Sequence, residues 1–436
     1  MSIFYNISSV FSRDVLLFFT SIGTGIVVAR FLGPESLGIW VALSIIPAYC
    51  EGFGRVKTDR AAVFFLGQKK ESEQTILNTI NIISLITCLI ILVPIFFLID
   101  DISRFIFSNQ SFDGTEYIIG MLIVVPLQFY YLNYTYFHLG LNNIRIFNRM
   151  VLISALVNSF FIIFFLFAFN GGIWSLIYAS FISNFLGLSY GFYKVERKNW
   201  TKAKYNFDFF SKILKYGFNF YLIGLFSELK EQGSKTITII FLKSNQIAFF
   251  GQGLNICKIV DRFSSSINAI LYTQISSSDE KNAVNISGLS FRVTLILVIV
   301  ITLVLYLTIE YLVVFLYGYE YLETATVVKI IIPAYSFYSV SNTLNSYFNG
   351  TGRNHMIPRI QILPLLILLI STYYLTLNFG LKGTCYGVAI GYFLYGFVLC
   401  HKFLWCSKNK VGYLVPNRSD LLVINQKLKI IKNKIW

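Results

Sequence analysis

Long, uninterrupted apolar runs are the feature that most constrains what this chain can fold into. They recur from one end of the sequence to the other, and many reach the roughly 20 residues that an α-helix needs to cross a bilayer. Only 13% of the 436 residues are charged, against about 25% in soluble domains. So few charges cannot solvate a globule of this size, and 43 Phe and 28 Tyr exclude a disordered chain. The sequence therefore predicts a polytopic membrane protein.

The runs predict an all-α fold with about twelve transmembrane helices. Helices are favoured over a β-barrel because barrel strands alternate polar and apolar residues, whereas these runs are apolar throughout. The expected spans are residues 14–32, 37–54, 78–99, 116–138, 150–169, 173–193, 214–242, 247–275, 288–309, 325–349, 357–378 and 383–404.

The distribution of Lys and Arg orients these helices. Most of the 36 basic residues lie before the first span, in the connections that follow even-numbered spans, or in the C-terminal tail. The opposite connections hold only Arg104, Lys243 and Lys382. The positive-inside rule then predicts that both termini are cytoplasmic. The formal net charge of +15 is explained by this topology, so nucleic acid is not expected as a partner.

The sequence also contains an internal repeat. FLGPESLGIW at 31–40 matches FLKSNQIAFF at 241–250, and FHLGLN at 137–142 matches YFNGTG at 347–352 at the same offset. At nearly that offset, Asn170 and Gly172 match Asn378 and Gly380. Three matches in register predict two parallel six-helix repeats around a central cleft, an arrangement that transporters use. The expected parts are an N-terminal lobe 1–193, a basic cytoplasmic linker 194–213, a C-terminal lobe 214–406 and a basic cytoplasmic tail 407–436.

Two stretches resemble a known family. ARFLGPESLGIW at 29–40 and GYEYLETATVVKIIIPAYSFYSVSNTLNSYFNGTGRN at 318–354 are similar to segments of bacterial polysaccharide-biosynthesis transporters, the O-antigen flippases. These belong to the multidrug/oligosaccharidyl-lipid/polysaccharide exporter superfamily. The resemblance implies a protein of the bacterial inner membrane that serves O-antigen and lipopolysaccharide biosynthesis. It would turn undecaprenyl-pyrophosphate-linked oligosaccharide units from the cytoplasmic to the periplasmic leaflet by alternating access. The implied partners are the lipid-linked oligosaccharide, the bilayer and the polysaccharide polymerase machinery.

Ionisable residues inside the expected spans mark the candidate site. A charge at mid-membrane costs about 2.5–3.5 kcal/mol on insertion scales, so charged stripes should face one another or a hydrated cavity. Arg and Lys are the usual donors to phosphate, and the resemblance implies a pyrophosphate headgroup. The cations expected to contact it are Arg30, Lys258, Arg262 and Lys329. The residues expected to serve in charge pairing or in proton coupling are Glu51, Glu228, Glu231, Lys235 and Asp261.

Other interpretations stay open for these residues. Glu231 and Lys235 could form a structural ion pair, and Arg30 and Lys329 lie near helix ends, where long cationic side chains reach the interface. Tyrosines at 130, 131, 134 and 136, and at 335, 338 and 347, could stack on sugars or face lipid.

The alternative function is a multidrug or other small-solute exporter of the same superfamily, although a net basic site favours an anionic cargo. No connection carries a catalytic constellation, so an enzyme is not expected, and neither a metal nor a cofactor is predicted.

Overall fold

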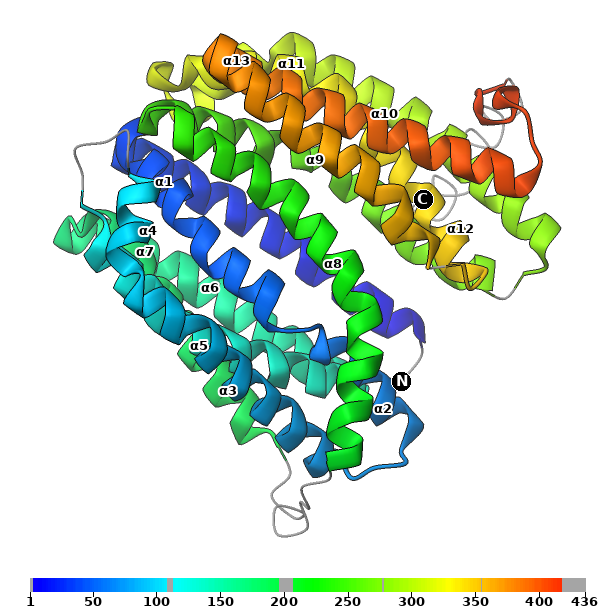
Figure 1. The fold of residues 1–436 in the computed structure, drawn as a ribbon, viewed down its shortest axis with the longest axis horizontal. Coiled ribbons are helices and arrows are strands. Elements are labelled where there is room, and N and C mark those ends of the chain that lie inside the picture. Colours follow the sequence, from blue (N-terminus) through cyan, green and yellow to red (C-terminus); the bar gives the residue numbers. More distant parts are fainter. Residues whose placement is uncertain (1–2, 108–112, 196–206, 277, 354, 418–436) are drawn as a thin grey trace, which may run out of the picture. The chain divides into compact units, whose positions relative to one another are not determined.

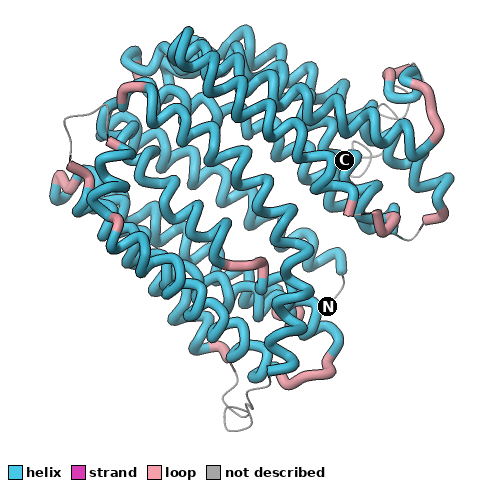
Figure 2. Tube along the Cα trace, in the orientation of Figure 1, coloured by secondary structure: helices cyan, strands magenta, loops and turns pink. Residues whose placement is uncertain are grey.

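The computed structural model describes residues 3–107, 113–195, 207–276, 278–353 and 355–417. Within these ranges the chain is almost entirely helical and contains no β-strand (Figures 1 and 2), which confirms the all-α fold class. The chain divides into two compact units, unit 1 (Met1–Ala248) and unit 2 (Phe249–Trp436), and each is described by itself.

The described residues of unit 1 form eight complete helices, and its apolar core includes residues of α2, α3, α5 and α8. Its helices are α1 (Ile3–Gly54), α2 (Thr58–Gln68), α3 (Glu73–Phe97), α4 (Ile99–Ile106), α5 (Thr115–Gly140), α6 (Ile144–Phe169), α7 (Gly172–Tyr193) and α8 (Phe207–Phe241). The core includes Leu66, Ile76, Ile80 and Phe137, all of them buried.

Unit 2 contains most of α9, which begins within unit 1, and the remaining helices. These are α9 (Ser244–Ser276), α10 (Glu280–Tyr317), α11 (Leu322–Ser341), α12 (Asn345–Gly350) and α13 (Met356–Ser407), with short 3₁₀ turns η2 (Tyr319–Tyr321), η3 (Asn342–Leu344) and η4 (Val411–Leu414). In this unit α11 packs along α10 and α13.

Seven of the described helices are long and apolar enough to cross a membrane: α1 from Ser12 onward, α3, α5, α6, α7, α10 and α13. Two of these, α1 and α13, are each broken by one glycine with non-helical dihedral angles, Gly33 and Gly380. Each therefore comprises two of the expected spans. The other three expected spans correspond to α8, α9 and α11, which are less apolar because they carry the charges discussed below.

The segments matched by the internal repeat occupy equivalent turns. Residues 31–40 contain the break in α1, and residues 241–250 contain the break between α8 and α9. Gly172, after α6, and Gly380, inside α13, both adopt a left-handed conformation, with φ of 52° and 56°. Side chains rarely adopt this conformation, so glycine suits both turns.

Unit 1 includes α8, so the division between the units lies at 248/249. The expected assignment of six helices to each lobe therefore stays a prediction. Of the expected linker 194–213, residues 196–206 lie outside the described residues, and α8 already begins at Phe207. Of the expected tail, residues 418–436 also lie outside them.

The two halves of α13 form a tight antiparallel hairpin about Gly380 (Figure 1). A methyl group at Gly387 would meet the backbone of Thr372, and one at Gly391 would meet the side chain of Leu368. As the residue number rises from 387 to 391 in the second half, the partner's number falls from 372 to 368 in the first half. The two halves of α13 therefore run in opposite directions. The small residues let the helix backbones approach closely, as in other membrane helix pairs.

Gly387→Ala should destabilise unit 2 by about 1–3 kcal/mol, because the added methyl group meets rigid backbone at residues 371 and 372. Thermal unfolding of the purified protein in detergent measures this loss. Gly23→Ala is the control, since nothing lies within 4 Å of that position. An equal loss in both variants would contradict the close helix contact.

Candidate functional site

A buried group of three charges lies where α1 is followed by α2. Arg55 Nη1 lies 3.3 Å from Glu51 Oε1, and Arg55 Nη2 lies 3.7 Å from Asp59 Oδ1. The side chains of Arg55 and Asp59 are 2% and 4% exposed, and that of Glu51 is 30% exposed. The pairing is needed because a buried charge without a partner costs several kcal/mol. We call these three residues the charge triad.

An unusual turn brings the charge triad together. Val56 and Lys57, between α1 and α2, both have positive φ angles, of 47° and 49°. For a β-branched residue such as Val56 this conformation is strained, at a cost of order 1–2 kcal/mol. The turn places Glu51, at the end of α1, and Asp59, at the start of α2, on either side of the Arg55 guanidinium.

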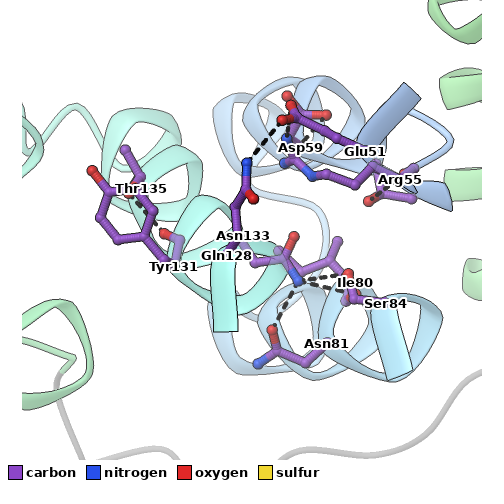
Figure 3. A network of polar contacts seen from close by, with 11 residues as sticks. Glu51, Arg55, Asp59, Ile80, Asn81, Ser84, Gln128, Tyr131, Asn133 and Thr135 are labelled. Carbon is purple, nitrogen blue, oxygen red and sulfur yellow. Dashed lines mark hydrogen bonds and ion pairs between the residues drawn. The ribbon is translucent and has the colours of Figure 1, made fainter. Parts of the chain in front are cut away.

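Neighbouring helices add amide and hydroxyl groups to this region (Figure 3). Gln128 of α5 donates from Nε2 to the second carboxylate oxygen of Glu51 at 3.1 Å. One turn and a half further along α5, the Asn133 amide donates to Ser84 Oγ at 2.8 Å and to Asn81 Oδ1 at 3.1 Å, both on α3. The polar contacts therefore join α1, α3 and α5 inside an otherwise apolar unit.

The second half of α1 packs antiparallel against α8, and this places Glu228 beside the charge triad. A methyl group at Gly52 would lie 3.0 Å from Glu228 Cγ. Nearer the start of α8, one at Gly224 would lie 2.5 Å from Lys57 Cε. Nearer its end, the hydroxyl groups of Tyr49 and Thr236 are 2.8 Å apart. Glu51 and Glu228, both expected site residues, therefore lie in one region of unit 1.

Glu231 and Lys235 form an ion pair with each other one turn apart on α8, with Lys235 Nζ 3.0 Å from Glu231 Oε1. Lys235 Nζ also lies 3.4 Å from Gln232 Oε1. This is the geometry of a structural i,i+4 pair. Their assignment to coupling or charge pairing stays a prediction.

In unit 2, Asp261 joins α9 to α11. Ser339 Oγ of α11 donates to Asp261 Oδ1 at 3.1 Å, and the hydroxyl oxygens of Ser339 and Ser264 are 2.8 Å apart. On the same helix, Lys258 is half-buried and Arg262 is exposed. Three of the expected site residues are therefore brought together on one stretch of α9.

Lys329 lies apart from that stretch and is bound by a residue that was not expected. Its Nζ is 2.6 Å from Glu310 Oε1 of α10 and 5.8 Å from the centre of the Tyr306 ring. Ten residues separate it from Ser339 on α11, roughly 15 Å along the helix. Its expected contact with the pyrophosphate stays a prediction.

Arg30 is exposed and lies near the break in α1 at Gly33. Glu51 lies 18 residues beyond that break, roughly 27 Å along the helix. Arg30 and the charge triad therefore occupy opposite ends of the second half of α1, and the structure does not bring them together.

Most of the tyrosines considered for sugar stacking are packed inside the units. Tyr131 and Tyr134 are buried in unit 1, and Tyr335, Tyr338 and Tyr347 are buried in unit 2. In unit 2 the ring of Tyr338 lies 4.9 Å from that of Tyr392 and 5.0 Å from that of Tyr395. These five rings serve packing, which was neither of the expected uses. Tyr130 and Tyr136 are half-buried.

Arg55, Asp59 and Gln128 are not among the site residues expected from the sequence. Arg55 follows the expected span 37–54, so the positive-inside rule assigns it to a cytoplasmic connection, whereas the structure buries it. A signal for the triad was present, because Glu51, Arg55 and Asp59 recur at intervals of four residues with alternating charge. Gln128 carried no such signal, since its contact with Glu51 joins two helices.

Arg55→Gln should destabilise unit 1 by about 3–5 kcal/mol, because it leaves the Asp59 carboxylate buried without its cation. Adding Glu51→Gln and Asp59→Asn should recover most of the loss, and unfolding in detergent measures both effects. Arg104→Gln is the matched control. Its partner Asp101 is exposed, so it should cost at most about 1 kcal/mol. A similar loss in both single variants would exclude a special role for the triad.

Comparison with solved structures identifies the fold. An inward-facing multidrug resistance MATE family transporter of the MOP superfamily is 15% identical, with a TM-score of 0.75 over 90% of this chain and 94% of that chain. The inward closed conformation of the lipid II flippase MurJ is 16% identical, with a TM-score of 0.73 over 95% of this chain and 89% of that chain. A mutant of the Vibrio cholerae MATE transporter VcmN is 15% identical, with a TM-score of 0.65 over 94% and 98%.

The sequence comparisons identify the family. No curated relative matches the chain by sequence. A family model described as polysaccharide biosynthesis protein matches residues 27–326, which is more than half of the chain. These residues include the charge triad, all of α8 and the α9 charges. The chain therefore belongs to the polysaccharide biosynthesis protein family and has the fold of the MOP superfamily.

Proposed function

We propose that the protein flips undecaprenyl-pyrophosphate-linked oligosaccharide units, of O-antigen or a similar surface polysaccharide, from the cytoplasmic to the periplasmic leaflet of the bacterial inner membrane. The observation that carries this proposal is the match to polysaccharide biosynthesis proteins over residues 27–326. The likeness to a structure named as a lipid II flippase supports it, because that name also describes a lipid-linked cargo. In this proposal both termini are cytoplasmic, and the polysaccharide polymerase machinery is a further partner.

Charged groups within the helices support transport over a purely structural role. Unit 1 holds the charge triad and Glu228, and unit 2 holds Lys258, Asp261 and Arg262 on α9. Retaining such groups in membrane helices is costly, and they usually mark pathways for substrates or ions. Alternating access between the two lobes would expose these groups first to one side of the membrane and then to the other.

The cations of α9 are the first candidates to bind the pyrophosphate. Lys258 and Arg262 are one helical turn apart, so their side chains share a face and could engage neighbouring phosphate oxygens. Arg55 is a further candidate from unit 1, because its Nε and Nη2 make no hydrogen bond with the described residues. Arg30 and Lys329 complete the proposed set, although Lys329 must exchange its contact with Glu310.

Glu51 and Glu228 are the proposed carriers of a coupling proton. Both lie beside Gly52, because Glu51 precedes it in the chain and a methyl group on Gly52 would lie 3.0 Å from Glu228 Cγ. Two nearby carboxylates repel each other, and a proton bound by either one relieves the repulsion. Protonation would therefore change the balance of charge next to Arg55 and alter its pairing. Glu231, Lys235 and Asp261 would hold neighbouring charges in place.

Export of multidrug substrates or other small solutes is the second candidate function. It is favoured by the TM-score of 0.75 with a MATE family transporter. The carboxylates around Gly52 would suit a cationic solute, whereas the α9 cations suit an anionic one. Both candidates are transporters, and the solved structures of similar fold are transporters and flippases.

Deletion of the gene in its host should trap lipid-linked repeat units on the cytoplasmic leaflet and abolish surface polysaccharide. Extraction of lipid-linked saccharides and staining of surface polysaccharide measure the two effects. Restoring the gene on a plasmid should reverse both. Normal polysaccharide together with increased drug sensitivity would instead establish the exporter.

Lys258→Gln and Arg262→Gln should each abolish complementation in that strain while leaving the protein in the membrane. Each removes a cation proposed to contact the pyrophosphate. Lys382→Gln is the control, because Lys382 is exposed near the break at Gly380 between the two halves of α13 and no site role is proposed for it. The amount of protein in isolated membranes is measured alongside polysaccharide. Full complementation by both α9 variants would remove these residues from the site.

A further inference from the structure

A cationic pocket lies between the two open ends of the α13 hairpin in unit 2. Its volume is about 890 Å³, within the usual range of small-molecule sites. Arg353, His401, Lys408 and Lys410 provide its basic lining, Asn409 adds a polar side chain, and none of the described residues that line it is acidic. Arg353 is held beside it by Glu280, with Nη2 2.6 Å from Oε1, and by Tyr347, whose hydroxyl is 2.7 Å from Nη1. Lys408 and Lys410 are exposed and lie at the end of α13.

Most of the remaining lining residues are apolar, and two of them are largely exposed. Trp405 and Val411 are 65% and 74% exposed, and Leu404 and Met356 also line the pocket. A free phosphate ion would leave this apolar surface uncovered. An occupant that fits the whole pocket combines an anionic group with an apolar chain.

The pocket lies at the depth of lipid headgroups. From the turn at Gly380 to Ser407 the second half of α13 measures roughly 40 Å, which exceeds the roughly 30 Å hydrocarbon core of a bilayer. The first half of α13 begins at Met356, on the same face of the membrane as Ser407. Exposed tryptophan and lysine at the end of a membrane helix are typical of the interfacial region.

Contacts with α10 hold the side of the pocket that is formed by Lys410 and Val411. After Val411 the chain returns to α10, where Arg292 Nη1 donates to the Tyr413 carbonyl at 2.8 Å. The Tyr413 hydroxyl lies 3.0 Å from Asn285 Oδ1, and burial raises the pKa of this tyrosine, so it remains a proton donor. The segment with Lys410 and Val411 is therefore held at both ends.

We propose that this pocket binds the phosphate headgroup of an anionic glycerophospholipid of the surrounding membrane, with its acyl chain along Trp405 and Leu404. Basic pockets at the ends of membrane helices recognise lipid headgroups in this way. Residues 418–436 of the chain are a poorer occupant, because they carry one Arg and four Lys against a single Asp. The site is separate from the proposed cargo site and does not depend on the identity of the cargo.

The test is the thermal unfolding of the full-length protein in detergent with added dioleoyl phosphatidylglycerol. The midpoint should rise with the lipid concentration. Phosphatidylcholine with the same chains should give little shift, and inorganic phosphate should neither reproduce the effect nor compete with it. The double variant Lys408→Gln/Lys410→Gln should raise the half-saturating concentration at least about tenfold, since each basic group near a lipid surface contributes roughly fivefold.

The matched control is Lys212→Gln/Lys215→Gln, which removes the same charge from exposed positions on α8 and should leave the lipid effect unchanged. An equal weakening in both double variants would overturn the proposal, because the effect would then reflect overall charge. Competition by inorganic phosphate, or an equal response to phosphatidylcholine, would also overturn it. Should the variant fail to fold, a photoreactive phosphatidylglycerol applied to the unaltered protein must label the peptide 401–411, and labelling elsewhere would contradict the site.

Discussion

A charge inside an apolar helix bundle must meet an opposite charge, and unit 1 is arranged around this constraint. Arg55 is almost fully buried. Its two ion-pair partners, Glu51 and Asp59, each lie four residues away in the chain. Breaking such a group by removing one member costs more than the group itself contributes, because the remaining charges stay buried. In this conformation the triad is therefore held together, and the surrounding helices accommodate it.

The accommodation is visible in the backbone. Val56 and Lys57 adopt left-handed conformations that let α2 turn back and present Asp59 to Arg55. On the other side, Gly52 and Gly224 allow the side chains of Glu228 and Lys57 to pass between α1 and α8. A methyl group at either glycine would displace the Glu228 or Lys57 side chain that lies against it. Strained backbone that is kept at a group of buried charges is a feature of functional sites. In this unit the pairing of the buried charges and the close packing of the helices around them therefore depend on each other.

The sequence determines the helices of this chain more clearly than its polar contacts. Apolar runs predicted residues 116–138, and the helix extends over Thr115–Gly140. The expected spans also left connections at the turns where Gly172 and Gly380 lie, and the repeat matched these two residues with each other. Positive-inside counting, however, treats every basic residue between two spans as solvated, and so it hid the burial of Arg55. The contacts of Lys329 with Glu310 and of Gln128 with Glu51 join different helices, and no local pattern in a single sequence specifies them.

The fold alone does not decide between an anionic lipid-linked cargo and a small solute, because the MATE transporter and MurJ match it almost equally well. The distinction must come from charges that can change partner during transport. Internal pairing already engages Lys329 with Glu310 and Lys235 with Glu231. Binding a pyrophosphate there would require each cation to leave a carboxylate, which offsets part of the gain. Lys258 and Arg262 share one face of α9, where two donors can act on one anion together. In the proposed function an anionic cargo would be recognised by the cations of α9, and in the alternative a cationic solute would be recognised by the carboxylates beside Gly52.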